Sequence, residues 1–461
     1  MHPRSSARFV SRRHLLIGSG TSLLASAWTG QGNGCDTTRT AASPQADDGV
    51  RVLKACLASV PLRGGGAAPT PVWCFGGSVP GPVLRVRRGE EVRLRLANEL
   101  PQPTGIHWHG VRAPAADAKT TLTLPAAGSA EAFEYRFRVP DAGTFWYHAR
   151  RDSRALAQGL YGALIVEESL PVETDRDALL ILDEWRFEDD GTIAADRPRS
   201  DQAPNLQLTA NGQPTFDIAV KASERVRLRL INAALNRGFL LRIDRHRAVV
   251  MAIDGEPTEP FEAQNGRVML GPGNRLDLFI DTTLAVGDVA SVLIEQPTGD
   301  VRVARLVYDR TPPARFVRRP DPSPLPANPL PLRMGFEQAV RVHVDLADDE
   351  AALQGSPWAV AALASAPLFS VRLGHTAILT LVNRGATPQA VHLHGHHFRL
   401  LDNLDDGWKP FWLDTLTVPA QQTLRLAFVA DNPGRWPIER RSLVQGRPTL
   451  TAWFEVAAGH P

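Results

Sequence analysis

Short segments in which apolar and polar residues alternate recur along the chain and predict β-strands. In residues 89–98, valine or leucine alternates with a charged residue, and the same pattern returns in residues 223–232 and, more loosely, in residues 374–383. Side chains on a strand point alternately to its two faces, so this pattern is typical of a half-buried strand. Glycines and prolines separate these runs, which favours short strands and turns over long helices. The pattern therefore predicts an all-β protein.

The three alternating segments are copies of one repeat, and each ends in an asparagine. These residues, Asn98, Asn232 and Asn383, are 134 and 151 residues apart. This spacing is the length of a β-sandwich domain with its loops, so it indicates domain triplication and not a solenoid of short repeats. A proline-rich stretch predicts a stiff linker after the second domain. We expect three β-domains at 45–170, 171–311 and 332–461, with the linker at 312–331.

Residues 1–34 have the pattern of an export signal. They carry four arginines and no acid, and an apolar stretch begins at Leu15. Arg12 and Arg13 directly precede this stretch, an arrangement that resembles the twin-arginine signal of proteins exported across the bacterial inner membrane. We therefore expect a periplasmic protein. The apolar stretch is shorter than the ~20 residues that a membrane-spanning helix needs, and no transmembrane segment is expected elsewhere.

The charge and the cysteines narrow the class of protein further. The formal charge is +2, and it becomes −2 without the four arginines of the export signal, so no nucleic-acid-binding surface is expected. The chain has three cysteines: Cys35, Cys56 and Cys74. Cys56 and Cys74 lie on neighbouring predicted strands, and whether they form a disulfide in the oxidising periplasm stays open. Whether Cys35 carries a lipid anchor stays open as well.

Histidines occupy matching positions in the first and third repeats. His107 and His109 stand nine and eleven residues after the repeat asparagine, and His392 and His394 stand at the same offsets in the third repeat. Residues i and i+2 of a strand face the same side, so each pair presents two imidazoles on one face. In the middle repeat these offsets carry aliphatic residues that we interpret as ordinary core: Leu241 and Ile243.

A second correspondence lies near the end of the first and third domains. Five and seven residues after a glycine, the first domain has His148 and Arg150, and the third has Glu439 and Arg441. We expect these positions and the two histidine pairs to converge on one interface between the two domains. The other histidines are expected at surface or packing positions (His246, His343, His375 and His460) or in a supporting role (His396 and His397).

Together these motifs resemble the multicopper oxidases, and the resemblance covers nearly the whole chain after residue 34. The matching segments are residues 79–82, 107–110, 143–148, 159–166, 392–396 and 431–434. The resemblance implies three cupredoxin-like Greek-key β-sandwich domains. It also implies a type 1 copper held by a cysteine and two histidines, and a cluster of three coppers held by eight histidines, where dioxygen is reduced to water.

Position by position, the resemblance assigns some ligand sites to other residue types. The type 1 positions fall on Gln389, Arg440, Gln445 and Leu450. A blue copper needs a thiolate, and no cysteine follows Cys74. Five cluster positions keep histidine: His107 and His392 at the type 2 site, His109 and His148 at one type 3 site, and His394 at the other. The remaining three are Arg150, Glu439 and Arg441.

The substituted positions shape the expected function. Arginine has no free lone pair and stays charged, so the binuclear type 3 pair is not expected and at most one copper ion is. Arg150 and Glu439 are expected to form a salt bridge. The expected function is a periplasmic binding or structural protein without laccase-type oxidase activity, whose substrate or protein partner is unknown. Two alternatives stay open: a mononuclear copper site on His107 and His392, or a laccase-like, copper-dependent oxidoreductase, as the family implies.

Overall fold

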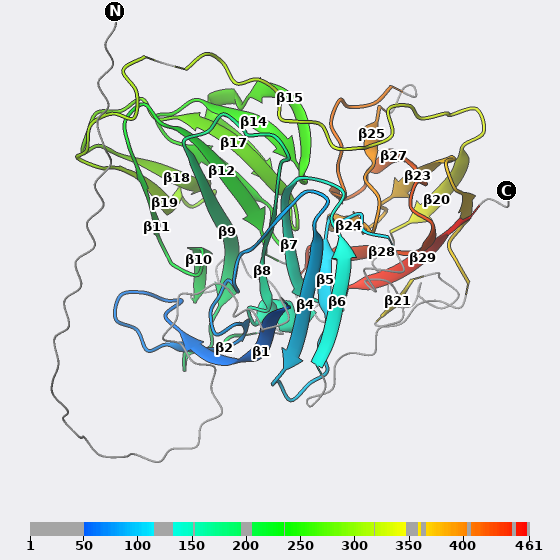
Figure 1. Ribbon diagram of the computed structural model, residues 1–461. Helices are drawn as coiled ribbons and strands as arrows, with labels where there is room; N and C mark the ends of the chain where they lie inside the picture. The colour runs from blue at the N-terminus through cyan, green and yellow to red at the C-terminus, as the bar shows by residue number, and fades with distance from the viewer. Residues whose placement is uncertain are drawn as a thin grey trace, which may run out of the picture. The chain divides into compact units, whose positions relative to one another are not determined.

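Nearly all of the helices and strands that the structure describes are β-strands, which confirms the predicted all-β class (Figure 1). The computed structural model describes residues 50–114, 132–150, 153–194, 205–234, 236–317, 319–346, 358–360, 366–402, 407–444 and 449–458. Helix is confined, among these residues, to α2 (Ser153–Ala157) and the 3₁₀ turn η1 (Gln264–Gly266), and no described helix is long and apolar enough to cross a membrane. The export signal and Cys35 lie outside the described residues, so both stay predictions.

The first two sheets comprise the strands before residue 168. One has the order β2-β1-β4-β6 and the other β3-β8-β7-β5. The bounds are β1 Arg51–Val60, β2 Thr70–Phe75, β3 Leu84–Arg87, β4 Glu91–Asn98, β5 Ile106–His109, β6 Ala132–Arg138, β7 Gly143–Ala149 and β8 Tyr161–Glu167.

The next two sheets are larger and contain the middle repeat. Their orders are β10-β9-β12-β17-β14-β15 and β11-β19-β18-β13-β16. The bounds are β9 Arg176–Arg186, β10 Leu206–Ala210, β11 Phe216–Val220, β12 Arg225–Asn232, β13 Phe239–Ile243, β14 Ala248–Ile253, β15 Glu256–Glu262, β16 Arg267–Leu270, β17 Arg275–Asp281, β18 Val289–Glu295 and β19 Val301–Tyr308.

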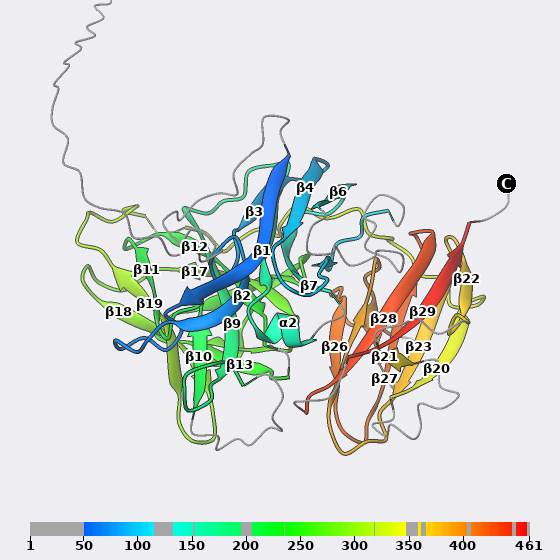
Figure 2. The same cartoon turned by 90° about the horizontal axis from the view of Figure 1, so that it is seen from below.

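The last two sheets follow the proline-rich stretch and are seen in Figure 2. Their orders are β20-β23-β27-β25 and β21-β29-β28-β24-β26, with β22 paired to β29. The limits of the three domains stay predictions. The bounds are β20 Val340–Asp345, β21 Ala359–Val360, β22 Ser370–Arg372, β23 Thr376–Val382, β24 Gln389–Leu393, β25 Arg399–Leu401, β26 Thr415–Val418, β27 Thr423–Val429, β28 Gly434–Ser442 and β29 Leu450–Ala457.

The repeat asparagines make the same hydrogen bonds in all three domains. Each side chain accepts from the backbone N–H two residues later and donates to a carbonyl four or five residues later, at 2.8–3.1 Å. Asparagine is favoured in such turns because its short amide can satisfy the local backbone. The three buried residues that share this role are Asn98, Asn232 and Asn383. The repeat therefore conserves a turn that starts the connection to the next strand.

The middle copy of the repeat strand differs from the expected half-buried pattern, because β12 is buried on both faces. Its polar positions are arginines that pair with carboxylates inside the protein. Arg225 bonds Asp281 at 2.7 Å, and Arg227 bonds Asp277 at 2.6 Å. Arg229 also contacts Asp277, at 3.2 Å. Guanidinium groups can be buried when carboxylates accept their hydrogen bonds. The alternation of apolar and charged residues in this strand therefore did not mean that its charged residues are exposed.

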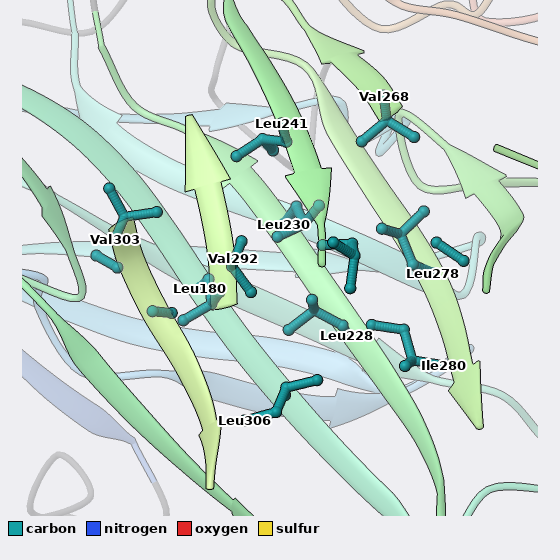
Figure 3. Close-up of a cluster of buried hydrophobic side chains, with 14 of the residues drawn as sticks. Leu180, Leu228, Leu230, Leu241, Val268, Leu278, Ile280, Val292, Val303 and Leu306 are labelled. Atoms are coloured by element: carbon teal, nitrogen blue, oxygen red, sulfur yellow. The ribbon is translucent and has the colours of Figure 1, made fainter. Parts of the chain in front are cut away.

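The aliphatic residues of the middle repeat lie in the core, as predicted. Leu241 and Ile243 on β13 are buried. Figure 3 shows Leu241 in one cluster with Leu228, Leu230 and Leu278. The middle domain therefore fills with hydrocarbon the positions at which the first and third domains carry imidazoles.

Cys56 and Cys74 face each other across the antiparallel pair of β1 and β2. Both are buried free thiols, and their sulfurs are 3.9 Å apart. A disulfide bond is about 2.05 Å long, so the structure has two neighbouring thiols at this position and not a bond.

Candidate metal centre

Five histidines from the first and third domains meet in one buried cluster, as the repeat predicted. His107 and His109 lie on β5, His148 on β7 and His392 on β24, while His394 follows β24 in a turn. The Nε2 atoms of His107 and His392 are 3.2 Å apart, and Nδ1 of His109 is 3.4 Å from Nε2 of His148. We call this set the five-histidine cluster.

The ring nitrogens are close enough to share metal ions. One group of possible ligands is His107, His109 and His148, and a second is His107, His392 and His394; within each group the ligand atoms lie within 4.8 Å of one another. Register explains the first group, since β5 and β7 are antiparallel and place His107 opposite His148. The second group exists only because β24 of the third domain packs against β5.

Backbone oxygens fix which nitrogen of two histidines carries the proton. Nδ1 of His148 donates to the carbonyl of Ala149 at 2.9 Å, and Nδ1 of His392 donates to the carbonyl of Asp414 at 3.1 Å. A carbonyl only accepts, so in the neutral rings the proton is on Nδ1 and the lone pair on Nε2. Both Nε2 atoms point to other histidines of the cluster, as metal ligands with this kind of supporting bond do.

Burial keeps four of the five imidazoles, those of His107, His109, His148 and His394, neutral at neutral pH. It lowers the pKa of His148 to about 3 and that of His394 to about 4, although nearby Glu439 raises both. Burial and the neighbouring histidines also hold the pKa values of His107 and His109 well below their ordinary value. A neutral imidazole has the free lone pair that a metal needs, so the cluster is ready to ligate.

A small cavity opens beside the cluster. Its volume is about 30 Å³, and among its lining residues are His109, His148, His392 and Glu439. A space of this size admits a water-sized molecule. A small ligand can therefore reach the imidazoles from this side.

Glu439 lies against a histidine of the cluster, with its Oε1 3.3 Å from Nε2 of His394. Register places it there, since β28 pairs with β24 and sets Glu439 opposite His392, next to the His394 turn. The carboxylate therefore adds an oxygen donor at the edge of the cluster. The salt bridge between Arg150 and Glu439 stays a prediction. The third substituted position, Arg441, donates to the hydroxyl of Thr449 at 3.1 Å.

The positions assigned to a type 1 copper lie in the third domain. Gln389 on β24 is completely buried, and Leu450 on β29 is buried as well. The guanidinium of Arg440 on β28 lies 5.2 Å from the ring centroid of Trp358. Gln445 lies outside the described residues.

Sequence reasoning missed two residues that support the cluster. The hydroxyl of Thr415 lies 2.9 Å from Nε2 of His109 and 2.9 Å from Nδ1 of His392, and the carboxylate of Asp414 is 3.5 and 3.4 Å from the same atoms. Both residues precede or begin β26, far from the histidine motifs in sequence. The sequence pattern that could have identified them is an acidic residue followed by a hydroxyl residue at the start of a strand. This pattern is common in proteins, so it did not single them out.

A cluster of buried histidines between the first and third of three β-sandwich domains is an arrangement that could hold metal ions, as in cupredoxin-type proteins. Three family models, each described as multicopper oxidase, match residues 60–170, 139–308 and 335–439. Multicopper oxidase MmcO from Mycobacterium tuberculosis is 27% identical over 450 residues, which cover 84% of this chain and 83% of that protein.

Solved structures agree over a larger share of the chain. Lac15 from a marine microbial metagenome is 30% identical, with a TM-score of 0.75 over 88% of this chain and 99% of that one. The multi-copper oxidase from Pseudomonas parafulva is also 30% identical, with a TM-score of 0.74 over 88% and 100% of the two chains. The chain therefore belongs to the multicopper oxidase family and has its three cupredoxin domains.

These findings correct the expected function. A binding or structural protein without oxidase activity was expected because some ligand positions carry other residues. The match to Lac15 spans 99% of that chain, and the five histidines form buried groups that resemble the ligands of the family's copper cluster. The alternative that the family implies is the better supported one. The geometry of the five histidines outweighs the substitutions at single ligand positions.

Proposed function

We propose that this protein is a copper-dependent oxidoreductase whose copper is bound by the five-histidine cluster. The observation that carries the proposal is the meeting of five buried imidazoles from two domains, with ring nitrogens 3.2–3.4 Å apart. Neutral imidazole is a preferred ligand of copper. Copper bound there supplies one-electron oxidation of a donor and reduction of dioxygen.

The residues present fit a metal. Nδ1 of His107 is buried and has no hydrogen-bond partner among the described residues, and the buried Nε2 of His394 makes no hydrogen bond there although the carboxylate of Glu439 lies 3.3 Å away. Buried polar atoms are rarely left unpartnered in native proteins, and a bound ion is one of the usual reasons. The support of His392 by Asp414 and Thr415 orients its free nitrogen toward His107 before any metal binds, which favours binding.

The number of copper ions follows from the donors that the chain retains. The two groups of three histidines, described above as possible ligands, share His107, so we expect one or two copper ions per chain. Arg150 and Arg441 cannot ligate, and Glu439 offers an oxygen beside His394. The type 1 positions offer no thiolate, so we propose that the donor delivers electrons to the cluster without a blue copper.

Copper content and oxygen consumption test this proposal together. Protein loaded with copper and freed of excess metal is analysed for copper per chain, and its oxygen uptake is followed with a phenolic donor. His107→Ala combined with His392→Ala should remove both copper and oxygen uptake, because these residues belong to the two groups of histidines. His343→Ala is the matched control, since this histidine is exposed on β20. Wild-type protein that retains no copper, or oxygen uptake that survives the double substitution, would refute the proposal.

A further inference from the structure

A second group of ligand-type side chains lies buried outside the five-histidine cluster. Asp141, Glu256 and His397 have possible ligand atoms within 4.8 Å of one another. Asp141 precedes β7, Glu256 begins β15 and His397 precedes β25, so the three predicted domains contribute one residue each. Their side chains are at most 2% exposed.

Two of these side chains have polar atoms that form no hydrogen bond among the described residues, although Nε2 of His397 lies 3.5 Å from Oδ2 of Asp414. Oε1 of Glu256 and both ring nitrogens of His397 are buried without a hydrogen-bond partner. Oε1 of Glu256 lies 3.6 Å from Nδ1 of His397, which is too far for a hydrogen bond. Leaving such groups unpartnered costs free energy, so they point to a missing ligand.

The local charges also favour a cation. Arg112 is shared by Asp141 and Asp431, at 2.8 and 2.7 Å. A second buried guanidinium, that of Arg275, is likewise shared by two carboxylates. With Glu256, five carboxyl groups share two guanidinium groups, and the imidazole of His397 lies between Glu256 and Asp414, at 3.6 and 3.5 Å. The carboxyl groups therefore outnumber the arginines, which favours a metal ion at this place.

The separation of the free atoms suits one ion held between them. Bonds of about 2.0–2.1 Å to nitrogen and oxygen, at tetrahedral angles, put two ligand atoms about 3.4 Å apart. Nδ1 of His397 and Oε1 of Glu256 are 3.6 Å apart, close to this value. Asn328 donates to Oε2 of Glu256 at 2.9 Å and thereby fixes the carboxylate with Oε1 free.

We propose that Glu256, His397 and Asp141 form a second metal site that binds a divalent transition-metal ion such as Zn²⁺. One imidazole with two carboxylates is a donor set that suits zinc, whereas the five-histidine cluster offers almost only imidazole. Asp141 keeps lone pairs for a metal although Arg112 bonds both of its oxygens, at 2.9 and 2.8 Å. Because the ligands come from three domains, the ion would link the domains and stabilise their packing.

Zinc binding to the full-length protein tests this site. Metal-free protein is equilibrated with Zn²⁺, and zinc per chain and melting temperature are measured for the wild type and for Glu256→Gln with His397→Gln. The double variant should bind one zinc ion fewer and lose the zinc-dependent rise in melting temperature. The matched control is Glu262→Gln with His343→Gln, an exposed pair that should bind as the wild type does.

Two further measurements separate this site from the five-histidine cluster. A variant with His107→Ala and His392→Ala should keep the zinc ion that the Glu256 variant loses. Anomalous diffraction from zinc-soaked wild-type crystals should show a peak between Glu256 and His397, a result that needs no variant to fold. The absence of this peak at saturating Zn²⁺, or an unchanged zinc count in Glu256→Gln with His397→Gln, would overturn the proposal.

Discussion

Arg275 holds the junction of the three domains, and its loss should be among the most damaging single changes. Its side chain is completely buried. It donates to the carboxylate of Asp414 at 2.9 and 2.5 Å, to the carbonyl of Asp254 at 2.8 Å and to that of Thr144 at 3.3 Å. We predict that Arg275→Met strongly destabilises the folded protein.

The magnitude follows from what the substitution leaves behind. Removing one partner of a buried ion pair costs about 3–5 kcal/mol, because the other charge stays desolvated. Here two carboxylates stay, and they already act on each other: burial and the charge of Asp414 raise the pKa of Asp254. We take the 461-residue chain to unfold in one cooperative transition, with an unfolding entropy of about 2.1 cal/mol/K per residue. Dividing the loss of free energy by this entropy gives an expected fall of about 3–5 °C in Tm.

A double-mutant cycle measures the pair itself. The free energy of unfolding is determined for Arg275→Met, Asp414→Asn, the combination and the wild type. Contacting residues of this kind should show a coupling energy of about 1–3 kcal/mol. Arg136→Met, which removes a surface ion pair with Glu91, should leave the free energy of unfolding nearly unchanged, because solvent screens the two charges. An unfolding free energy for Arg275→Met within about 0.5 kcal/mol of the wild-type value would show that the junction does not depend on this pair. Additive effects of the two substitutions would show the same.

Three further predictions concern separate parts of the molecule. Gly143→Ala should lower the free energy of unfolding by more than about 2 kcal/mol, because φ is +148° and an added Cβ would lie 2.1 Å from a carbonyl oxygen of the middle domain. Gly89→Ala meets open space and should lower it by about 1 kcal/mol. Equal losses of stability, measured by unfolding in denaturant, would contradict this. Burial raises the pKa of Asp183 from 3.8 to about 7, so its contribution to stability is full below about pH 4 and is lost as the pH rises through 7. Asp183→Asn should therefore flatten the dependence of unfolding free energy on pH between 4 and 8, and an unchanged slope would show that this carboxyl is ionised in the folded state. Cys56 and Cys74 should react with a thiol reagent only after unfolding, so unfolding should add two equivalents to whatever Cys35 contributes, and no added equivalents under non-reducing conditions would reveal a disulfide instead.

Much of the fold and of the metal centre could be predicted because it follows from local rules. Alternation specifies strands, the spacing of the repeat asparagines specifies three domains, and the i, i+2 spacing puts His107 and His109, or His392 and His394, on one face. Counting from the repeat also identified His148. These inferences needed only the pleat of a strand and the equivalence of copies, so no tertiary contact had to be known.

Contacts between different strands could not be predicted in this way. Register decided that Glu439 lies against His394, and a period-two pattern does not specify which residues of two strands face each other. The buried arginines of β12 likewise depended on acids contributed by other strands.

The sequence by itself determined the all-β class, the triplication and the identity of the five histidines. The tertiary structure was needed to show that these rings meet, that burial lowers the pKa values of four of them, and that backbone carbonyls choose the tautomers of His148 and His392. It also decided that Asp141, Glu256 and His397 lie together. No motif joins residues so far apart in the chain, and only the packing of three domains brings their side chains within ligand distance.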